Sequence, residues 1–154
     1  MQKKRAAALL LAATAVPAML LGTSTAAYAG TGVTWQDAAT GYYLESVTGT
    51  NSVITFWNGG AQGTHWTDIQ NSDGSWNEVD QWGRCLTAYW QDQVYTENCN
   101  SAADGTNWYQ RWYEVNTGNG WKLVNRETGR VLDSNGNGSV YTGPDNGGSY
   151  QRWH

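Results

Sequence analysis

The sequence predicts an all-β fold built from three similar units, and three observations lead to this prediction. First, three apolar residue types recur in one order: Leu44, Leu86 and Leu132, then Val53, Val94 and Val140, then Trp66, Trp112 and Trp153. The copies lie 41 to 46 residues apart, a period typical of folds assembled from one repeated unit. Second, short β-branched or aromatic runs alternate with Gly, Asn and Asp turns. Third, no stretch after residue 29 keeps a helical apolar period for three turns.

The expected strands follow these runs along the chain. Each unit opens on an aromatic or apolar strand, at residues 33–35, 75–77 and 120–122. A glycine then precedes the strand that carries the recurring Leu, at Gly41, Gly83 and Gly129. The runs that continue each unit are 42–44 and 52–55, then 84–87 and 93–96, then the segment around Leu132 and 139–142. Asn-Gly and Asp-Gly pairs between the runs predict tight turns.

Three units of about four strands each, or about 12 strands, suit a closed barrel that hairpins cap around a pseudo-threefold axis. Closure also removes the unpaired strand edges that promote aggregation. On this interpretation the recurring Leu, Val and Trp side chains form one shared core. The expected unit boundaries are about 31–71, 72–116 and 117–154.

The first 29 residues resemble a secretory signal peptide. Lys3, Lys4 and Arg5 form a basic start, residues 6–21 are apolar, and Ala27-Tyr28-Ala29 is a small-x-small cleavage site. We expect cleavage after Ala29 and a secreted domain at residues 30–154. Nothing later in the chain is apolar enough to cross a membrane.

The charge of the expected mature chain excludes some classes of partner. Removing the leader leaves six basic and thirteen acidic residues, a net charge of −7. Nucleic-acid binding requires a basic surface, and anionic membranes repel an acidic chain. We therefore predict no nucleic-acid partner and no membrane insertion, and we expect a monomer.

The two cysteines, Cys85 and Cys99, predict one structural disulfide. An even number of cysteines in an exported chain is typical of disulfide bonding. A metal pair or a redox dithiol would need CxxC-like spacing or nearby histidines, and the sequence has neither.

Two segments near the ends of the units resemble a known family. Gln110-Arg111-Trp112 and Gln151-Arg152-Trp153 are similar to the QxW repeats of ricin B-type lectin domains, which are β-trefoils, whereas the first unit has Thr64-His65-Trp66. Residues 132–153 resemble still more closely the repeats of actinohivin-type lectins, which bind the α1-2-linked mannose ends of high-mannose glycans. The positions of Cys85 and Cys99 also match the cysteine-bearing repeat of those lectins.

The resemblance implies a shallow carbohydrate-binding site in the third unit, formed by Asp133, Tyr141 and Asn146 with Tyr150 and Gln151 beside them. The chemistry of these side chains suits a sugar. A carboxylate accepts charge-assisted hydrogen bonds from hydroxyl groups, Asn both donates and accepts, and an aromatic ring covers an apolar C–H face. The residues 135–138 predict a turn that brings Asp133 and Tyr141 together.

The other two units depart from this pattern. The second unit keeps Tyr95, Asn100, Tyr109 and Gln110 as a second candidate site, but Thr87 replaces the Asp. It also has five extra residues within 101–108. In the first unit the matching residues are Glu45, Ile54 and Gly59. We therefore expect one complete site, one incomplete site, and one site that is lost or altered.

Purely structural interpretations stand beside these assignments. Gln151 and Trp153 suit a core position, in which the amide satisfies nearby backbone groups. Asp133 before Ser-Asn-Gly suits a turn cap. Asp133-x-Asn135-x-Asn137-Gly138 resembles half of a calcium loop, but Pro144 stands where a bidentate Glu is required. The sequence thus predicts no metal site and no cofactor.

The sequence as a whole predicts a secreted, non-catalytic lectin for mannose-type glycans. Two other functions stay open. A β-trefoil inhibitor of a protease or other hydrolase would act through the loop at residues 99–108. A polysaccharide-degrading enzyme would use a pair of carboxylates that folding brings together. The sequence has no GxSxG or HExxH motif, and His65 and His154 are far apart along the chain.

Overall fold

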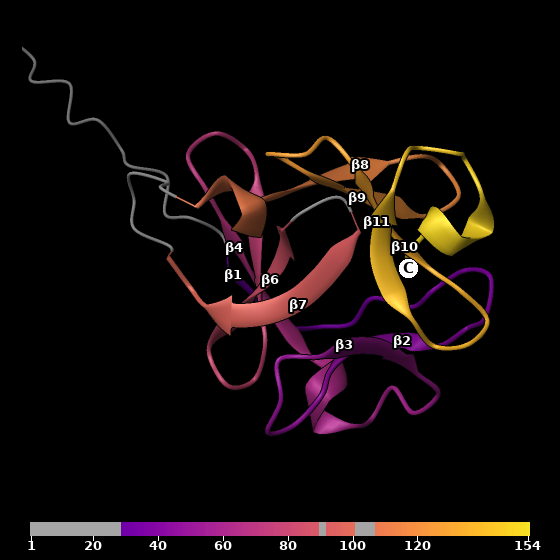
Figure 1. Ribbon diagram of the computed structural model, residues 1–154, viewed down its shortest axis with the longest axis horizontal. Helices are drawn as coiled ribbons and strands as arrows, with labels where there is room; N and C mark the ends of the chain where they lie inside the picture. The colour runs from indigo at the N-terminus through magenta and orange to yellow at the C-terminus, as the bar shows by residue number, and fades with distance from the viewer. Residues whose placement is uncertain (1–28, 90–91, 101–106) are drawn as a thin grey trace, which may run out of the picture.

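The computed structural model describes residues 29–89, 92–100 and 107–154 (Figure 1). The described chain contains eleven strands and three short 3-10 helices. The strands are β1 (Ala29–Val33), β2 (Tyr43–Ser46), β3 (Val53–Phe56), β4 (Trp66–Gln70), β5 (Trp76–Val79), β6 (Arg84–Tyr89), β7 (Gln93–Asn98), β8 (Trp112–Asn116), β9 (Trp121–Asn125), β10 (Val131–Ser134) and β11 (Val140–Gly143). The 3-10 helices are η1 (Gln62–Thr64), η2 (Trp108–Gln110) and η3 (Ser149–Gln151).

Five strands and the penultimate residue, Trp153, close a barrel. The antiparallel pairs run β1–β4, β4–β5, β5–β8 and β8–β9. Trp153 then bridges both Trp121 of β9 and Asp37, which follows β1. About twelve strands were expected, and Trp153 occupies the place of the twelfth as an isolated bridge.

Three hairpins cap this barrel: β2–β3, β6–β7 and β10–β11. The second strand of each hairpin contacts the second strands of the other two, through Ser52↔Tyr95, Tyr141↔Gln93 and Ile54↔Ser139. Figure 1 shows β3, β7 and β11 meeting around the middle of the molecule. The cyclic pairing confirms the predicted pseudo-threefold arrangement of the three units.

The recurring Leu and Trp residues are joined by a hydrogen bond as well as by packing. The indole Nε1 of Trp66 donates to the Leu44 carbonyl at 3.0 Å, and that of Trp112 to the Leu86 carbonyl at 3.0 Å. The Trp153 indole makes the same bond to the Leu132 carbonyl. All six side chains are buried in one core cluster. This bond satisfies the only polar atom of a buried indole, which explains why Leu and Trp recur together.

The glycine before each Leu strand has a backbone reason to be glycine. Gly41, Gly83 and Gly129 have φ values of +74°, +78° and +68°. In each unit the glycine amide donates to the carbonyl four or three residues earlier, which closes a tight turn into the hairpin. Residues with a Cβ disfavour positive φ, so this turn selects glycine three times.

The predicted disulfide is present between Cys85 and Cys99, near the two ends of the β6–β7 hairpin. The sequence separation is 14 residues. We expect a protein with both cysteines replaced by Ala to lose roughly 3 kcal/mol of unfolding free energy, because the unfolded chain gains the entropy of an open loop. Urea unfolding of the two proteins measures this loss. An unchanged midpoint would contradict the expectation.

Several expectations fall at or beyond the edge of the described residues. The predicted leader lies outside them except for Ala29, which is the first residue of β1 and pairs with Ile69. Most of the 99–108 loop, residues 101–106, also lies outside them. Within the described chain, no helix is both long and apolar enough to cross a membrane.

Candidate functional site

The third unit brings Asp133 and Tyr141 together as a directly opposed pair on β10 and β11. The turn between these strands is the predicted one. The Asn135 Oδ1 accepts hydrogen bonds from the amides of Asn137 and Ser139 at 3.0 and 3.1 Å, and Gly138 has a φ of +86°. The short polar side chain and the glycine together specify this turn, which places the carboxylate beside the phenol.

A glutamine holds the Asp133 carboxylate in place. The Gln151 Nε2 donates to Asp133 Oδ2 at 2.9 Å and to the Pro144 carbonyl at 2.8 Å, while its Oε1 accepts from the Asn146 amide at 2.9 Å. The other carboxylate oxygen accepts from the Ser134 amide at 2.9 Å. We call this set of contacts around the Gln151 amide the glutamine clamp. It connects the hairpin to the loop that carries Asn146.

The glutamine clamp changes the role of one predicted binding residue. Gln151 was grouped with the binding residues, but its side chain is fully buried at 0 % exposure. In this structure its amide is enclosed, where it bonds to Asp133 and to the Asn146 backbone. Asp133 itself is 5 % exposed. Each of its oxygens has a second lone pair beyond the one used by the protein donor, so it can still accept from a hydroxyl.

Two tyrosines and one asparagine surround Asp133. The Tyr141 hydroxyl donates to the Ser134 carbonyl at 3.0 Å. Burial raises the pKa of Tyr141, and the nearby Asp133 and Tyr150 raise it further. Tyr150 is 39 % exposed, and its hydroxyl oxygen would lie 3.5 Å from a methyl group at Gly136, so the side chain reaches over the turn. Asn146 is exposed, and its Oδ1 accepts from the Gly148 amide. The four predicted ligand-facing residues thus belong to one region.

The second unit repeats the glutamine clamp with a different carboxylate. The Gln110 Nε2 donates to Glu97 Oε1 at 3.0 Å and to the Asn98 carbonyl at 3.1 Å, and its Oε1 accepts from the Asn100 amide at 2.9 Å. Gln110 is fully buried like Gln151, so it too is a positioning residue. Asn100 contributes its backbone to the clamp.

Glu97 compensates for the missing Asp of the second unit. In the third unit Asp133 lies on the first hairpin strand and Gly143 lies on the second. A Cβ added at Gly143 would lie 3.3 Å from Asp133 Oδ2. In the second unit the matching positions are Thr87 and Glu97. The carboxylate thus lies on the other strand of the hairpin, yet it accepts a bond from the equivalent glutamine, Gln110.

Glu97 lines a hollow of about 250 Å³ together with four other side chains: Tyr89, Tyr95, Asn107 and Tyr109. The rings of Tyr89 and Tyr109 pack edge to face at 4.9 Å. Burial raises the pKa of Tyr95, and the neighbouring Glu97 raises it further, as Asp133 does for Tyr141. Sequence reasoning missed Glu97 because it compared only equivalent positions. The paired change from Asp/Gly to Thr/Glu across one hairpin was the available signal.

The first unit has neither the clamp nor the ring. Thr64 stands in place of the Gln, and Gly63 stands in place of Tyr150. A Cβ at Gly63 would lie 2.9 Å from the Glu45 Cγ, so the Glu45 side chain occupies the space beside it. Burial raises the pKa of Glu45. This unit therefore does not repeat the arrangement of the other two.

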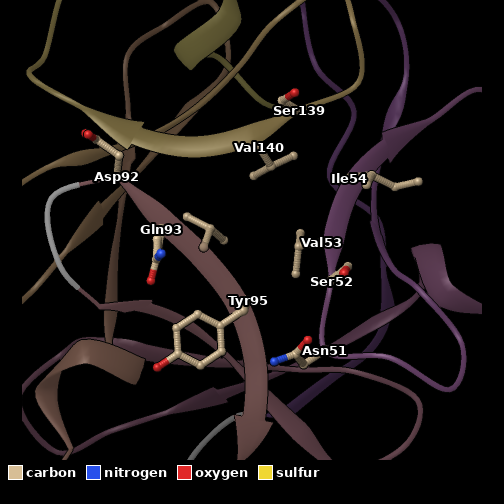
Figure 2. Close-up of a pocket in the computed structure, with 10 residues that line it drawn as sticks. Asn51, Ser52, Val53, Ile54, Asp92, Gln93, Tyr95, Ser139 and Val140 are labelled. Atoms are coloured by element: carbon tan, nitrogen blue, oxygen red, sulfur yellow. The ribbon is translucent and has the colours of Figure 1, made fainter.

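A larger hollow, of about 680 Å³, lies where β3, β7 and β11 meet (Figure 2). Its lining includes equivalent residues from all three units, among them Val53, Val94 and Val140. Figure 2 shows Val53 and Val140 facing the middle of the hollow. Of the predicted site residues only Tyr95 belongs to this lining. The hollow follows from the threefold closure and is separate from the clamp of the third unit.

Comparison with known proteins supports the fold. No protein-family model matches the chain. A designed protein with threefold symmetry, ThreeFoil, has a TM-score of 0.69 and 22% sequence identity, over 79% of this chain and 94% of that one. An endo-β-galactosidase from Clostridium perfringens that releases GlcNAcα1-4Gal has a TM-score of 0.67 and 16% identity, over 80% of this chain and 31% of the enzyme. The chain thus matches about a third of the enzyme's length.

The threefold hairpin contacts and these similarities define the class of the protein as a β-trefoil with one disulfide, as predicted. The identities are low, so they indicate the fold and leave the function to the geometry of the site.

Proposed function

We propose that this β-trefoil is a secreted, non-catalytic carbohydrate-binding protein for mannose-type glycans. The observation that carries the proposal is the glutamine clamp, which holds a carboxylate beside a tyrosine in both the second and the third unit. Its geometry supports recognition of adjacent sugar hydroxyls, which need fixed acceptors and a nearby apolar ring. The resemblance to mannose-binding lectins supports the choice of sugar.

At the third unit the Asp133 carboxylate accepts hydrogen bonds from sugar hydroxyls, and the exposed Asn146 side chain supplies an amide. Tyr150 presents a partly exposed ring to the apolar face of the sugar. The site makes few contacts, so the affinity of one site is weak.

At the second unit Glu97 takes the role of Asp133, and Asn107 takes that of Asn146. The Asn107 Nδ2 lies 3.4 Å from Glu97 Oε1, and Tyr95 and Tyr109 complete the hollow. The protein then has two sites and not the single complete one expected from the sequence. Two sites on one glycoprotein bind more tightly than either alone.

Secretion is part of the proposal. The basic, apolar and small-residue sequence at residues 1–29 supports export, and the Cys85–Cys99 disulfide suits an oxidising compartment.

Tyr150→Ala is expected to weaken binding of a mannose oligosaccharide to the third site by about tenfold, because one sugar–ring contact is worth up to about 1.5 kcal/mol. The Tyr150 side chain is partly exposed, so the melting temperature should change little. The measurement is made in a Glu97→Gln background, which removes the second proposed site. Isothermal titration then compares Glu97→Gln with Glu97→Gln/Tyr150→Ala, so that only the third site is measured. Tyr42→Ala, which removes an exposed ring elsewhere, is the matched control. Equal affinities would remove Tyr150 from the site.

A glycan array with the 30–154 protein tests the sugar class. Binding to mannose-terminated glycans supports the proposal, and the absence of such binding contradicts it. If the same protein released sugar products from a polysaccharide, the proposed function would be wrong and the protein would be a hydrolase.

A further inference from the structure

Three acidic side chains from different strands meet inside the barrel. Asp68 lies two residues after Trp66 on β4, and Glu114 lies two residues after Trp112 on β8. Alternate residues of a strand point to the same face, so both carboxyl groups point inward like the buried Trp side chains. Glu78 on β5 directly opposes Asp68. One carboxyl oxygen of each residue lies within 4.8 Å of those of the other two.

These carboxyl groups are buried and only partly satisfied. Asp68 is 8 % exposed and Glu78 is 0 % exposed, while Glu114 is partly exposed. The Trp35 indole donates to Glu78 Oε2 at 3.0 Å. Asp68 Oδ1, Glu78 Oε1 and Glu114 Oε1 are buried, and among the described residues no donor outside the cluster bonds to them. Glu78 Oε1 is the strongest indication of a missing partner, because the whole Glu78 side chain is enclosed and water cannot reach it from the surface.

No Lys, Arg or His of the described residues forms an ion pair with this cluster. The five ion pairs found in the described part of the chain involve other carboxylates. Burial raises the pKa of Glu78 well above its usual value and that of Glu114 to about 7, and the neighbouring Asp68 contributes to both increases. Buried like charges without a counter-charge are costly, so the cluster requires either shared protons or a bound cation.

We propose that Asp68, Glu78 and Glu114 form a binding site for one Ca²⁺ ion within the barrel. Ligand atoms of a single ion lie no further apart than two bond lengths, which is about 4.6–5.2 Å for Ca²⁺. The 4.8 Å spread of the three oxygens meets this limit. Three carboxylate oxygens are the donor type that this ion prefers, and Glu114 is the one residue of the three that is partly exposed. The site is separate from the carbohydrate sites.

Terbium luminescence tests this site directly, because Tb³⁺ occupies oxygen-ligated Ca²⁺ sites and nearby indoles sensitise its emission. Trp35 is hydrogen-bonded to Glu78, so the indole lies next to the proposed ion. The secreted protein is stripped with a chelator, then titrated with Tb³⁺ at pH 7 under Trp excitation. We expect a single saturable phase of one ion per chain, displaced by Ca²⁺, and a melting temperature that rises with Ca²⁺ concentration.

Glu114→Gln is the informative variant, since it is isosteric and its side chain is partly exposed. We expect it to lower Tb³⁺ affinity at least tenfold and to abolish the effect of Ca²⁺ on the melting temperature. Glu127→Gln makes the same change at an exposed residue and should behave like the wild type. Three results would overturn the proposal: no saturable emission from the wild type, equal emission from Glu114→Gln, or a melting temperature insensitive to Ca²⁺. If the wild type shows neither saturable emission nor a response of the melting temperature to Ca²⁺, the carboxyl groups share protons and bind no ion. The wild-type titration decides the matter even if the variant does not fold.

Discussion

The double variant Glu97→Gln/Asp133→Asn is expected to lose about 10²–10⁴-fold in apparent affinity for a high-mannose glycoprotein displayed on a surface. Each substitution removes the negative charge from one proposed acceptor, and the avidity that comes from engaging two sites disappears with the second. Either single variant should retain one site and bind with the weak affinity of that site. Surface-based binding measured at equal protein density gives the comparison.

The number of sites can be counted independently. Titration of a soluble mannose oligosaccharide should give two sites in the wild type, one in each single variant and none in the double variant. A wild-type count of one would contradict the role of Glu97. The proposed function itself would fail differently, through the absence of mannose binding in every protein.

Folding must be checked for each of these variants. At Asp133→Asn the new amide replaces an oxygen that accepts from Gln151 or Ser134, so a buried donor loses its partner. We expect this variant to lose about 1–3 kcal/mol of unfolding free energy. Glu97→Gln can keep its oxygen toward Gln110, so it should melt close to the wild type. Binding is therefore compared below the lowest melting temperature.

Trp153→Ala is expected to lower the free energy of unfolding by about 3–5 kcal/mol, a large part of the stability of a domain of this size. The Trp153 side chain is completely buried and its indole donates to the Leu132 carbonyl. Removing the ring leaves a cavity in the core and an unsatisfied carbonyl. Its backbone also joins Trp121 to Asp37 and so closes the barrel.

Urea unfolding followed by circular dichroism measures this effect. Trp57→Ala is the matched control, because Trp57 is 67 % exposed and its removal should change the unfolding free energy by no more than about 0.5 kcal/mol. Similar losses in the two variants would show that burial does not distinguish the recurring Trp residues from the others.

Much of the fold could be predicted from the sequence, because core burial and turn conformation each restrict which residue type can stand at a given position. Leu44, Leu86 and Leu132 recur because each lies in the core and accepts a bond from the Trp of its own unit. The glycines recur because each unit repeats the same positive-φ turn. The resemblance to mannose-binding lectins pointed to Asp133 and Tyr141, which the structure places as neighbours on one hairpin.

The sites themselves depend on contacts that are not local in the sequence. Gln151 and Gln110 were grouped with binding residues, but burial makes them supports. Glu97 was missed because its carboxyl group replaces that of an Asp on the opposite strand, which equivalent positions do not show. Its position becomes meaningful only when it is seen to accept a bond from Gln110.

The sequence by itself thus determined the three units, the core, the turns and the disulfide, because periodic burial and backbone conformation leave periodic residues. Only the tertiary structure decided which polar groups meet. Asp68, Glu78 and Glu114 are 10 and 36 residues apart along the chain. Asp68 and Glu114 each follow a recurring Trp by two residues, but no local pattern links Glu78 to them. They become one cluster because β4, β5 and β8 are neighbours in a closed barrel, where strand pairing, and not sequence spacing, sets the distances between side chains.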